Sequence, residues 1–314
     1  MHYNHLFGPV QSRRLGVSLG VDLIPFKTCN CNCVYCECGG AKVVPHERHE
    51  YIPAKSLIAE LDHYLATRPS LDYVTFAGSG EPTLNSALGT VLRFVNDRFP
   101  DCRTALLTNG TLFHMAEVRE EAMPFDLILP SIDAASEEVF NIVNRPYPGL
   151  TARQIIDGLA TFSHVYRGQI WVEVFIVPGI NDTPEELIRL KDALQKIRFA
   201  RVQLNSLDRP GACEWVKTAS ADSLSEIADF LKPLPVEIIS RSAGNTLSTP
   251  PQYENLSATI EHQLLRRPAT LEEIAVLCSV TINAVNPILK DLVAENRIEK
   301  SVVNGREFFA VTSK

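Results

Sequence analysis

Five of the eight cysteines in this chain of 314 residues lie within one ten-residue stretch: Cys29, Cys31, Cys33, Cys36 and Cys38. The other three, Cys102, Cys213 and Cys278, stand singly. Because the first residues form neither a cationic nor an apolar segment, no secretory signal is expected, and the thiols are expected in a reducing, cytoplasmic compartment. Thiols kept close together there are typical of metal sites rather than of disulfides. The cluster therefore predicts a metal centre on one short loop.

Composition limits the classes of protein to which the chain can belong. With 45% hydrophobic and 21% charged residues, it is expected to be globular rather than collagen-like, disordered or a small disulfide scaffold. No apolar run approaches the roughly 20 residues that span a bilayer, so no membrane association is predicted. The net charge of −7 disfavours indiscriminate nucleic-acid binding by the whole chain, although it leaves a local basic groove open.

Short β-rich runs alternate with helical patterns from about residue 18 to residue 240. Strands are expected at 19–23, 73–77, 104–108, 127–132, 170–177 and 202–207, and helices at 54–67, 84–96, 151–164 and 183–197. Strands separated by helices predict right-handed crossovers and a parallel sheet covered on both faces. Six such units are too few for a closed barrel of eight, so we predict an α/β fold, a partial (β/α)6 TIM-like barrel over residues 1–240. Reactive groups in such barrels lie where strands end and loops begin.

A second, smaller unit is predicted beyond a linker. Residues 241–255 are rich in turn formers, which is typical of a linker. Residues 256–314 show three helical patterns, with Thr281 as a candidate cap of the third and Pro287 expected to kink that helix or to shift its start. Two strands, at 298–303 and 307–311, flank Asn304-Gly305, a strong two-residue hairpin signal. Three helices followed by a hairpin predict a small C-terminal winged-helix domain.

The spacing within the cysteine cluster indicates which metal centre it can hold. Only one register, Cys29, Cys33 and Cys36, reads Cys-x-x-x-Cys-x-x-Cys. Three thiolates on one loop can hold three irons of a [4Fe–4S] cluster and leave the fourth iron open to another ligand. Five close cysteines can also supply the four ligands of a structural zinc ion, so zinc is the alternative. With an iron–sulfur cluster, Cys31 and Cys38 have no assigned role.

This spacing, with the aromatic Tyr35 before the third cysteine and a first strand ahead of the loop, resembles the radical S-adenosylmethionine (SAM) superfamily. The resemblance implies a [4Fe–4S] cluster on Cys29, Cys33 and Cys36, whose open iron binds the amino and carboxylate groups of SAM. It further implies reductive cleavage of SAM, hydrogen abstraction by a 5′-deoxyadenosyl radical, and a flavodoxin- or ferredoxin-like electron donor.

Polar residues at successive strand ends match the SAM-binding motifs of that superfamily in order. The segment Gly78-Ser79-Gly80-Glu81 looks like its glycine-rich loop, and Asn109 follows the next strand. Ser131 and Asp133 are implied near the methionine or ribose, Glu173 faces inward, and Asn181 lies in a turn that resembles the adenine-contacting loop. Each also has a plain structural alternative: a strand-to-helix turn, a helix cap at Ser131, or a buried amide. The order of the motifs favours contact with SAM.

The substrate is constrained by fewer residues. Residues 7–16 and 20–25, with Asn144-Arg145-Pro146, are similar to a group related to the wyosine-base-forming enzymes, which modify a guanosine of tRNA. That group carries three further cysteines ahead of the main motif, whereas none precedes Cys29 here. An RNA nucleoside, a small molecule and a peptide are therefore all candidate substrates, and the candidate contacts are Arg13, Arg14, Arg145 and Asn205. Surface ion pairs are the alternative role for these arginines.

The C-terminal residues bear on possible partners. Residues 256–314 contain seven Lys/Arg and seven Asp/Glu. Phosphate binding depends on clustered cations, so DNA binding is not expected, and a contact with protein or substrate is favoured. The hypothesis from another class of protein is a metal- or redox-sensing regulator, with the cysteines as sensor and the winged helix as DNA reader.

Overall fold

The computed structural model describes residues 3–45, 47–239, 256–278 and 280–312, so the predicted linker at 241–255 lies outside the described residues. Eight strands form one sheet in chain order: β1 (Leu6–Ser12), β2 (Gly16–Asp22), β3 (Tyr73–Ala77), β4 (Thr104–Thr108), β5 (Leu127–Pro130), β6 (Gln169–Ile176), β7 (Arg201–Ser206) and β8 (Val236–Ile238). Strands β2 to β8 pair in parallel, and only β1 is antiparallel to its neighbour β2. The sheet is the partial barrel that the alternation of strands and helices predicts.

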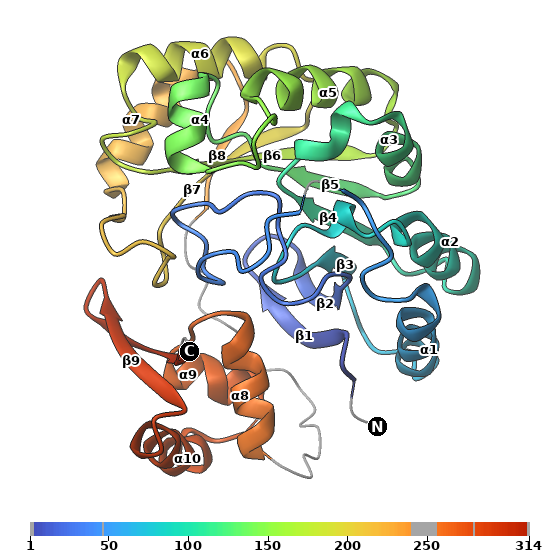
Figure 1. Ribbon diagram of the computed structural model, residues 1–314, viewed down its shortest axis with the longest axis vertical. Helices are drawn as coiled ribbons and strands as arrows, with labels where there is room; N and C mark the ends of the chain where they lie inside the picture. Colours follow the sequence, from blue (N-terminus) through green and yellow to red (C-terminus); the bar gives the residue numbers. More distant parts are fainter. Residues whose placement is uncertain (1–2, 46, 240–255, 279, 313–314) are drawn as a thin grey trace.

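Seven α-helices connect the strands: α1 (Ala54–Leu65), α2 (Leu88–Arg98), α3 (Ala116–Ala122), α4 (Glu137–Val143), α5 (Ala152–Val165), α6 (Pro184–Leu194) and α7 (Ala221–Leu231). Two 3-10 helices, η1 (Pro82–Leu84) and η2 (Thr111–His114), follow β3 and β4. Figure 1 shows the helices along the outer side of the curved sheet. Hydrogen bonds from capping side chains fix the residues at which several helices begin. At α5, for example, Thr151 and Gln154 form a reciprocal capping box, which satisfies backbone N–H groups that have no partner within the helix.

The six predicted strands correspond to β2 through β7, and the structure adds two that the sequence pattern did not show. Strand β1 was missed because its pairing is interrupted by an irregularity between Phe7 and Val10, which breaks the period-two pattern. Strand β8 was missed because it has only three residues. Strand β5 ends at Pro130, two residues before the predicted end, although the Ser131 N–H still donates to Thr108 of β4 and the Ile132 N–H to Glu173 of β6.

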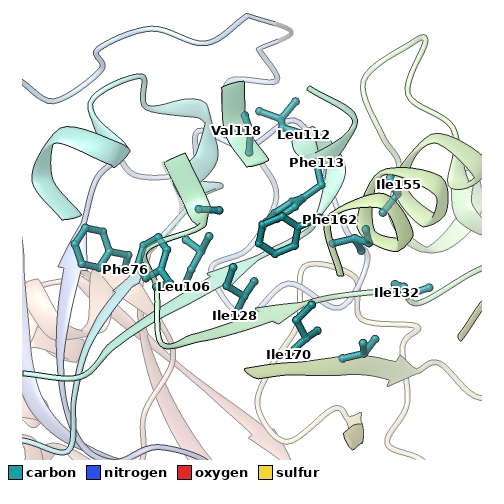
Figure 2. Packing of buried hydrophobic residues seen from close by; sticks show 14 of the residues in the cluster. Phe76, Leu106, Leu112, Phe113, Val118, Ile128, Ile132, Ile155, Phe162 and Ile170 are labelled. Atoms are coloured by element: carbon teal, nitrogen blue, oxygen red, sulfur yellow. The ribbon is translucent and has the colours of Figure 1, made fainter. Parts of the chain in front are cut away.

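The core lies between the sheet and the outer helices. Figure 2 shows Ile128 of β5 beside Phe113 and Phe162, with Leu106, Ile170 and Phe76 in the same cluster. The rings of Phe113 and Phe162 meet edge to face with centroids 4.9 Å apart, a favourable aromatic geometry. This packing holds the strands in fixed register, so the loops at their carboxyl ends are carried on a rigid support.

The C-terminal segment, residues 256–312, contains α8 (Leu256–Arg266), α9 (Leu271–Leu277), α10 (Ile282–Ala294), β9 (Ile298–Val303) and β10 (Arg306–Val311). The predicted hairpin is present, and its turn residues Asn304 and Gly305 have positive φ angles of 51° and 72°. Thr281 precedes α10 but its side chain makes no capping hydrogen bond, and Pro287 lies inside this helix, whose start is not displaced. In the described part of the chain, no single helix is long and apolar enough to cross a membrane. Only if α9 and α10 are taken together, across a bend of 116°, does a segment reach the required length and apolar composition.

Candidate active site

All five clustered cysteines lie on the loop between β2 and α1, which is tied to the barrel through its backbone. On one side the Asn32 N–H donates to the carbonyl of Asn144 at 3.0 Å. On the other side the Glu81 N–H donates to the carbonyl of Thr28 at 3.2 Å. The loop is therefore held between the end of α4 and the loop that follows β3, at the carboxyl-end rim of the barrel.

Amide groups donate hydrogen bonds to the sulfur atoms of two motif cysteines. The Asn109 Nδ2 lies 3.6 Å from the Cys29 Sγ, and the Asn144 Nδ2 lies 3.5 Å from the Cys33 Sγ. The Cys31 backbone nitrogen lies 3.5 Å from the Cys29 Sγ. Donors of this kind stabilise thiolates and tune iron–sulfur centres. The loop thus supplies sulfur ligands together with hydrogen bonds that would support them.

The two cysteines outside the motif are direct neighbours of motif cysteines. A hydrogen bond with Cys38 lowers the pKa of Cys36, and a hydrogen bond with Cys33 raises the pKa of Cys31 well above its ordinary value. Burial, followed by repulsion from Cys33, raises the pKa of Cys29. Cys31 is buried, whereas the three motif cysteines are half-buried.

The donor set fits a [4Fe–4S] cluster on Cys29, Cys33 and Cys36. All three thiols come from one loop and are partly open, which suits the ligation of three irons with the fourth left open, and two of them accept amide hydrogen bonds. In the described ranges, no three His, Cys, Asp or Glu side chains are arranged to hold a single metal ion.

The glycine-rich loop after β3 packs so closely on the cysteine loop that it has no room for side chains. A Cβ on Gly80 would lie 2.6 Å from the Ile24 Cγ2 and 2.9 Å from the carbonyl carbon of Thr28. A Cβ on Gly78, which has a φ of +152°, would collide with the Asp22 carboxylate. Both glycines are therefore needed for the close approach of the two loops.

Glu81 is a buried carboxylate that joins this loop to the end of β4. Its Oε1 accepts hydrogen bonds from the Thr83 backbone and from the hydroxyls of Thr83 and Thr108, the last at 2.6 Å. Its Oε2 accepts the Asn109 backbone N–H at 2.7 Å and keeps lone-pair capacity for a further donor. Burial raises the pKa of Glu81, while these hydrogen bonds act in the opposite direction.

A second buried carboxylate, Asp133, lies after β5. Its Oδ2 accepts the Tyr35 hydroxyl at 2.5 Å and the Asn144 amide at 2.7 Å, and its Oδ1 accepts the Phe175 backbone N–H at 2.9 Å. Burial raises the pKa of Asp133 to about 6, with the Tyr35 hydrogen bond as the largest opposing effect. The Tyr35 ring also stacks on the Phe175 ring with centroids 3.8 Å apart. Asp133 thus links the cysteine loop to β6.

The amide of Asn181, for which the resemblance implies a contact with adenine, is engaged by backbone groups in this structure. It is fully buried, and its Nδ2 donates to the carbonyls of Asp133 at 2.8 Å and Phe175 at 2.7 Å. Its Oδ1 accepts the Val177 N–H at 2.7 Å. Every polar group of this side chain is used to hold the turn after β6, so Asn181 shapes the loop rather than contacting a base directly.

Ser131 is half-buried beside a hollow of about 10 Å³ that Asn109 and Asp133 also line. A hollow of this size has room for about one water molecule. Binding of a larger molecule between these strand ends therefore requires side chains around it to move.

Glu173 faces the inside of the barrel, as expected, and two of the predicted substrate contacts lie beside it. Arg14 forms an ion pair with Glu173, and the Asn205 Nδ2 lies 3.4 Å from a Glu173 oxygen. Arg13 is paired with Asp208 at 3.4 Å. The turn between β1 and β2 thus reaches across to the ends of β6 and β7.

Arg145 does not join the other predicted substrate contacts. Its guanidinium lies 3.5 Å from the Cys213 Sγ, and its backbone carbonyl accepts the Asn32 N–H at 3.1 Å. The neighbour Asn144, which contacts both Cys33 and Asp133, is the residue of that motif with a role at the site. In the Asn-Arg-Pro motif the sequence favours Arg145 as the substrate contact, because a charged side chain is a stronger signal of binding than an amide.

Residues 23–191 match the radical SAM superfamily, a span that contains the cysteine loop, the glycine-rich loop and the strand ends described above. The chain belongs to the radical SAM superfamily. Members of this superfamily bind a [4Fe–4S] cluster and SAM, which are therefore the cofactors of this protein.

Curated relatives extend the similarity along the chain. A UPF0026 protein of Helicobacter pylori (strain J99) is 37% identical over 275 residues, which cover 85% of this chain and 86% of that one. A protein named GTPase Obg of Brachyspira hyodysenteriae is 32% identical over 312 residues, 98% of this chain but only 45% of that longer protein. A probable dual-specificity RNA methyltransferase RlmN 3 of Opitutus terrae is 25% identical over 64% of this chain and 54% of that protein.

Among solved structures, a radical SAM methyltransferase from Sphaerobacter thermophilus has the same fold. The TM-score is 0.54 at 18% sequence identity, and the match covers 70% of this chain and 66% of that one. This likeness supports the partial barrel as the architecture of the radical SAM core.

Proposed function

We propose that this radical SAM protein cleaves SAM reductively and directs the resulting 5′-deoxyadenosyl radical to a hydrogen atom of a substrate held inside the barrel. When bound, the cluster supplies one electron to the sulfonium, whose carbon–sulfur bond breaks to give methionine and the radical. The observation that carries the proposal is the set of three motif thiols on one loop, two of them with amide donors, beside the buried carboxylates at the same rim.

The chain's own residues would hold and orient the reactants. Cys29, Cys33 and Cys36 bind the irons, and the free lone-pair capacity of Glu81 Oε2 suits the ammonium of the SAM methionine. Asp133 would accept from hydroxyl groups of SAM once its Tyr35 contact is exchanged. Because these groups are fixed by packing before the reaction, their orientation needs little reorganisation.

The reaction also needs an external electron source. A flavodoxin- or ferredoxin-like protein in a reducing, cytoplasmic compartment would supply it, because the thiol ligands must stay reduced to bind iron.

The substrate is an RNA nucleoside, a small molecule or a peptide. The partial match to an RNA methyltransferase favours RNA, whereas the equal numbers of acidic and basic residues in the C-terminal segment disfavour a surface that tracks a phosphate backbone. Transfer of deuterium from labelled candidates into 5′-deoxyadenosine identifies the substrate among them.

The proposal is tested by anaerobic reconstitution followed by assay of 5′-deoxyadenosine with SAM and dithionite. Wild-type protein and Cys102→Ala, a change outside the loop, are expected to bind about four irons per chain and to form 5′-deoxyadenosine. Cys33→Ala is expected to lose this activity. Colourless zinc protein that shifts DNA without SAM, or unchanged SAM cleavage in Cys33→Ala, would contradict the proposal and favour the regulator hypothesis or another ligand set.

A further inference from the structure

A cavity of about 340 Å³ lies between the barrel strands and the C-terminal segment. Ser18 of β2 and Thr75 of β3 form part of its barrel side, and Gln263 and Arg267 form part of the opposite side. Its volume is within the range of small-molecule sites, roughly 300–1,000 Å³. The cavity therefore lies beside strands β1 to β4 of the partial barrel, and the C-terminal segment forms its opposite wall.

The cavity adjoins the loops that would hold the cofactors. Cys38 of the cysteine loop and Ser79 of the glycine-rich loop both line it. A molecule in this cavity would thus lie next to the site where the radical is formed, which is the position that a substrate of this chemistry needs.

Two arginine-centred contacts join the C-terminal segment to the barrel. Arg266 forms an ion pair with Asp22 at the end of β2, and both side chains are only 11% exposed. Arg209, which follows β7, forms an ion pair with Glu273 of α9 and lies 3.4 Å from Glu37 of the cysteine loop. Removal of one partner from a buried ion pair of this kind strongly destabilises the protein, because the other charge is left buried and unpaired. The segment is therefore a fixed wall of the cavity.

Arginines dominate the charge of the cavity lining: Arg13, Arg14, Arg209, Arg266 and Arg267. Four of them have an acidic partner: Asp208, Glu173, Glu273 and Asp22, respectively. Within the described residues, the Arg267 side chain makes no ion pair and no hydrogen bond to a protein group. Arg267 is thus the arginine of this lining that is available to a ligand.

The surroundings of Arg267 favour an anion. Burial, followed by repulsion from Arg209, lowers its pKa, while Glu37 and Glu273 act in the opposite direction, and a guanidinium stays charged at neutral pH. Both of these carboxylates are already paired with Arg209, so a further negative group would stabilise the half-buried Arg267 cation. The guanidinium fork matches the two oxygens of a carboxylate or phosphate.

We propose that this cavity binds a small molecule bearing a carboxylate or phosphate group, with Arg267 as the residue that holds that group. The C-terminal segment would then form part of the substrate site rather than a separate reader of nucleic acid. This inference rests on the proposed function, since the cavity matters as a substrate site only if the radical is formed beside it. A small molecule fits better than RNA because the segment forms one wall of the cavity and carries no excess of cations.

Isothermal titration calorimetry of the purified protein tests the inference without any cofactor. The probes are pyrophosphate and malonate, titrated separately at constant ionic strength, so that a phosphate and a carboxylate source are compared. Arg267→Gln is expected to raise the dissociation constant of the bound anion about tenfold or more. Arg167→Gln, the same change at an exposed arginine, is expected to leave it unchanged, and Arg267→Lys is expected to retain part of the affinity.

The inference is overturned if neither anion binds, if Arg267→Gln binds as well as wild type with an unchanged melting temperature, or if Arg167→Gln weakens binding equally. Binding of a tRNA transcript that Arg267→Gln weakens, without binding of either small anion, would overturn it in favour of RNA. Dithionite-driven SAM cleavage without substrate is expected to persist in the control Arg167→Gln, which lies outside the cavity. A failure of the proposed function would instead appear as absent cleavage in wild type, with anion binding intact.

Discussion

Replacement of Gly80 by alanine should disturb the cysteine loop more than the size of one added methyl group suggests. The new methyl carbon would collide with the Thr28 carbonyl oxygen, and it would lie 2.6 Å from the Ile24 Cγ2 and 2.9 Å from the Thr28 carbonyl carbon. Because comfortable carbon–carbon contacts begin near about 3.5 Å, the two carbon atoms would have to move by at least about 0.6–0.9 Å. Thr28 directly precedes Cys29, so the displacement is passed to a cluster ligand.

The expected cost has two parts. Overpacking of this kind costs about 1–3 kcal/mol. Moving the Thr28 carbonyl also weakens the hydrogen bond that it accepts from the Glu81 N–H at 3.2 Å, a loss of about 1 kcal/mol. Together these lower the free energy of unfolding by about 2–4 kcal/mol, which corresponds to a fall in melting temperature on the order of 10 °C.

Thermal unfolding followed by circular dichroism, with iron content after anaerobic reconstitution, measures this effect. Gly40→Ala is the matched control on the same loop, because its methyl group would meet only the Asn32 Oδ1, at an ordinary 3.5 Å. If Gly80→Ala melts with wild type and Gly40→Ala and binds the same iron, the close approach of the two loops does not constrain the site.

Two further predictions follow from buried titratable groups. Burial is the main reason why the pKa of Asp133 is raised to about 6 from an ordinary 3.8. The protonated Asp133 therefore contributes to stability below about pH 4, and this contribution is lost as the pH rises through 6. The loss is about 3 kcal/mol between pH 4 and pH 7, and the Asp133→Asn variant should not show it. Denaturant unfolding across that range measures it, and parallel curves for the two proteins would contradict it. Burial raises the pKa of Cys278 to about 11. At pH 8 the native protein should therefore be alkylated at the half-buried Cys102 well before Cys278. Mass spectrometry measures the alkylation rate of each cysteine, and equal rates would show that the C-terminal core opens freely.

The parallel strands and the order of the motifs were accessible from the sequence because both follow local patterns. The apolar runs of β3, β4 and β5 are bounded by turn residues, and Glu81, Asn109 and Asp133 lie in the loops that follow them. Strand β1 was not accessible, since an irregularity in its pairing removes the alternation that marks a half-buried strand.

Side-chain direction was the part of the site that sequence could not supply. Asn181 stands in the motif position that resembles an adenine contact, yet its amide is used by three backbone groups. Likewise, nothing local shows that Arg266 meets Asp22, 244 positions away. Such pairings depend on how elements that are distant in the sequence pack together, and the periodicity of apolar residues does not predict that.

The cysteine loop is anchored to α4 and to the glycine-rich loop by main-chain groups, which every amino acid possesses. Between the thiols, however, side chains add to this anchorage: Asn30 donates to the Thr111 hydroxyl, Val34 is buried, and Tyr35 donates to Asp133. A substitution at any of these three positions would therefore loosen the seat of the irons even though every thiol and every main-chain bond of the loop were kept.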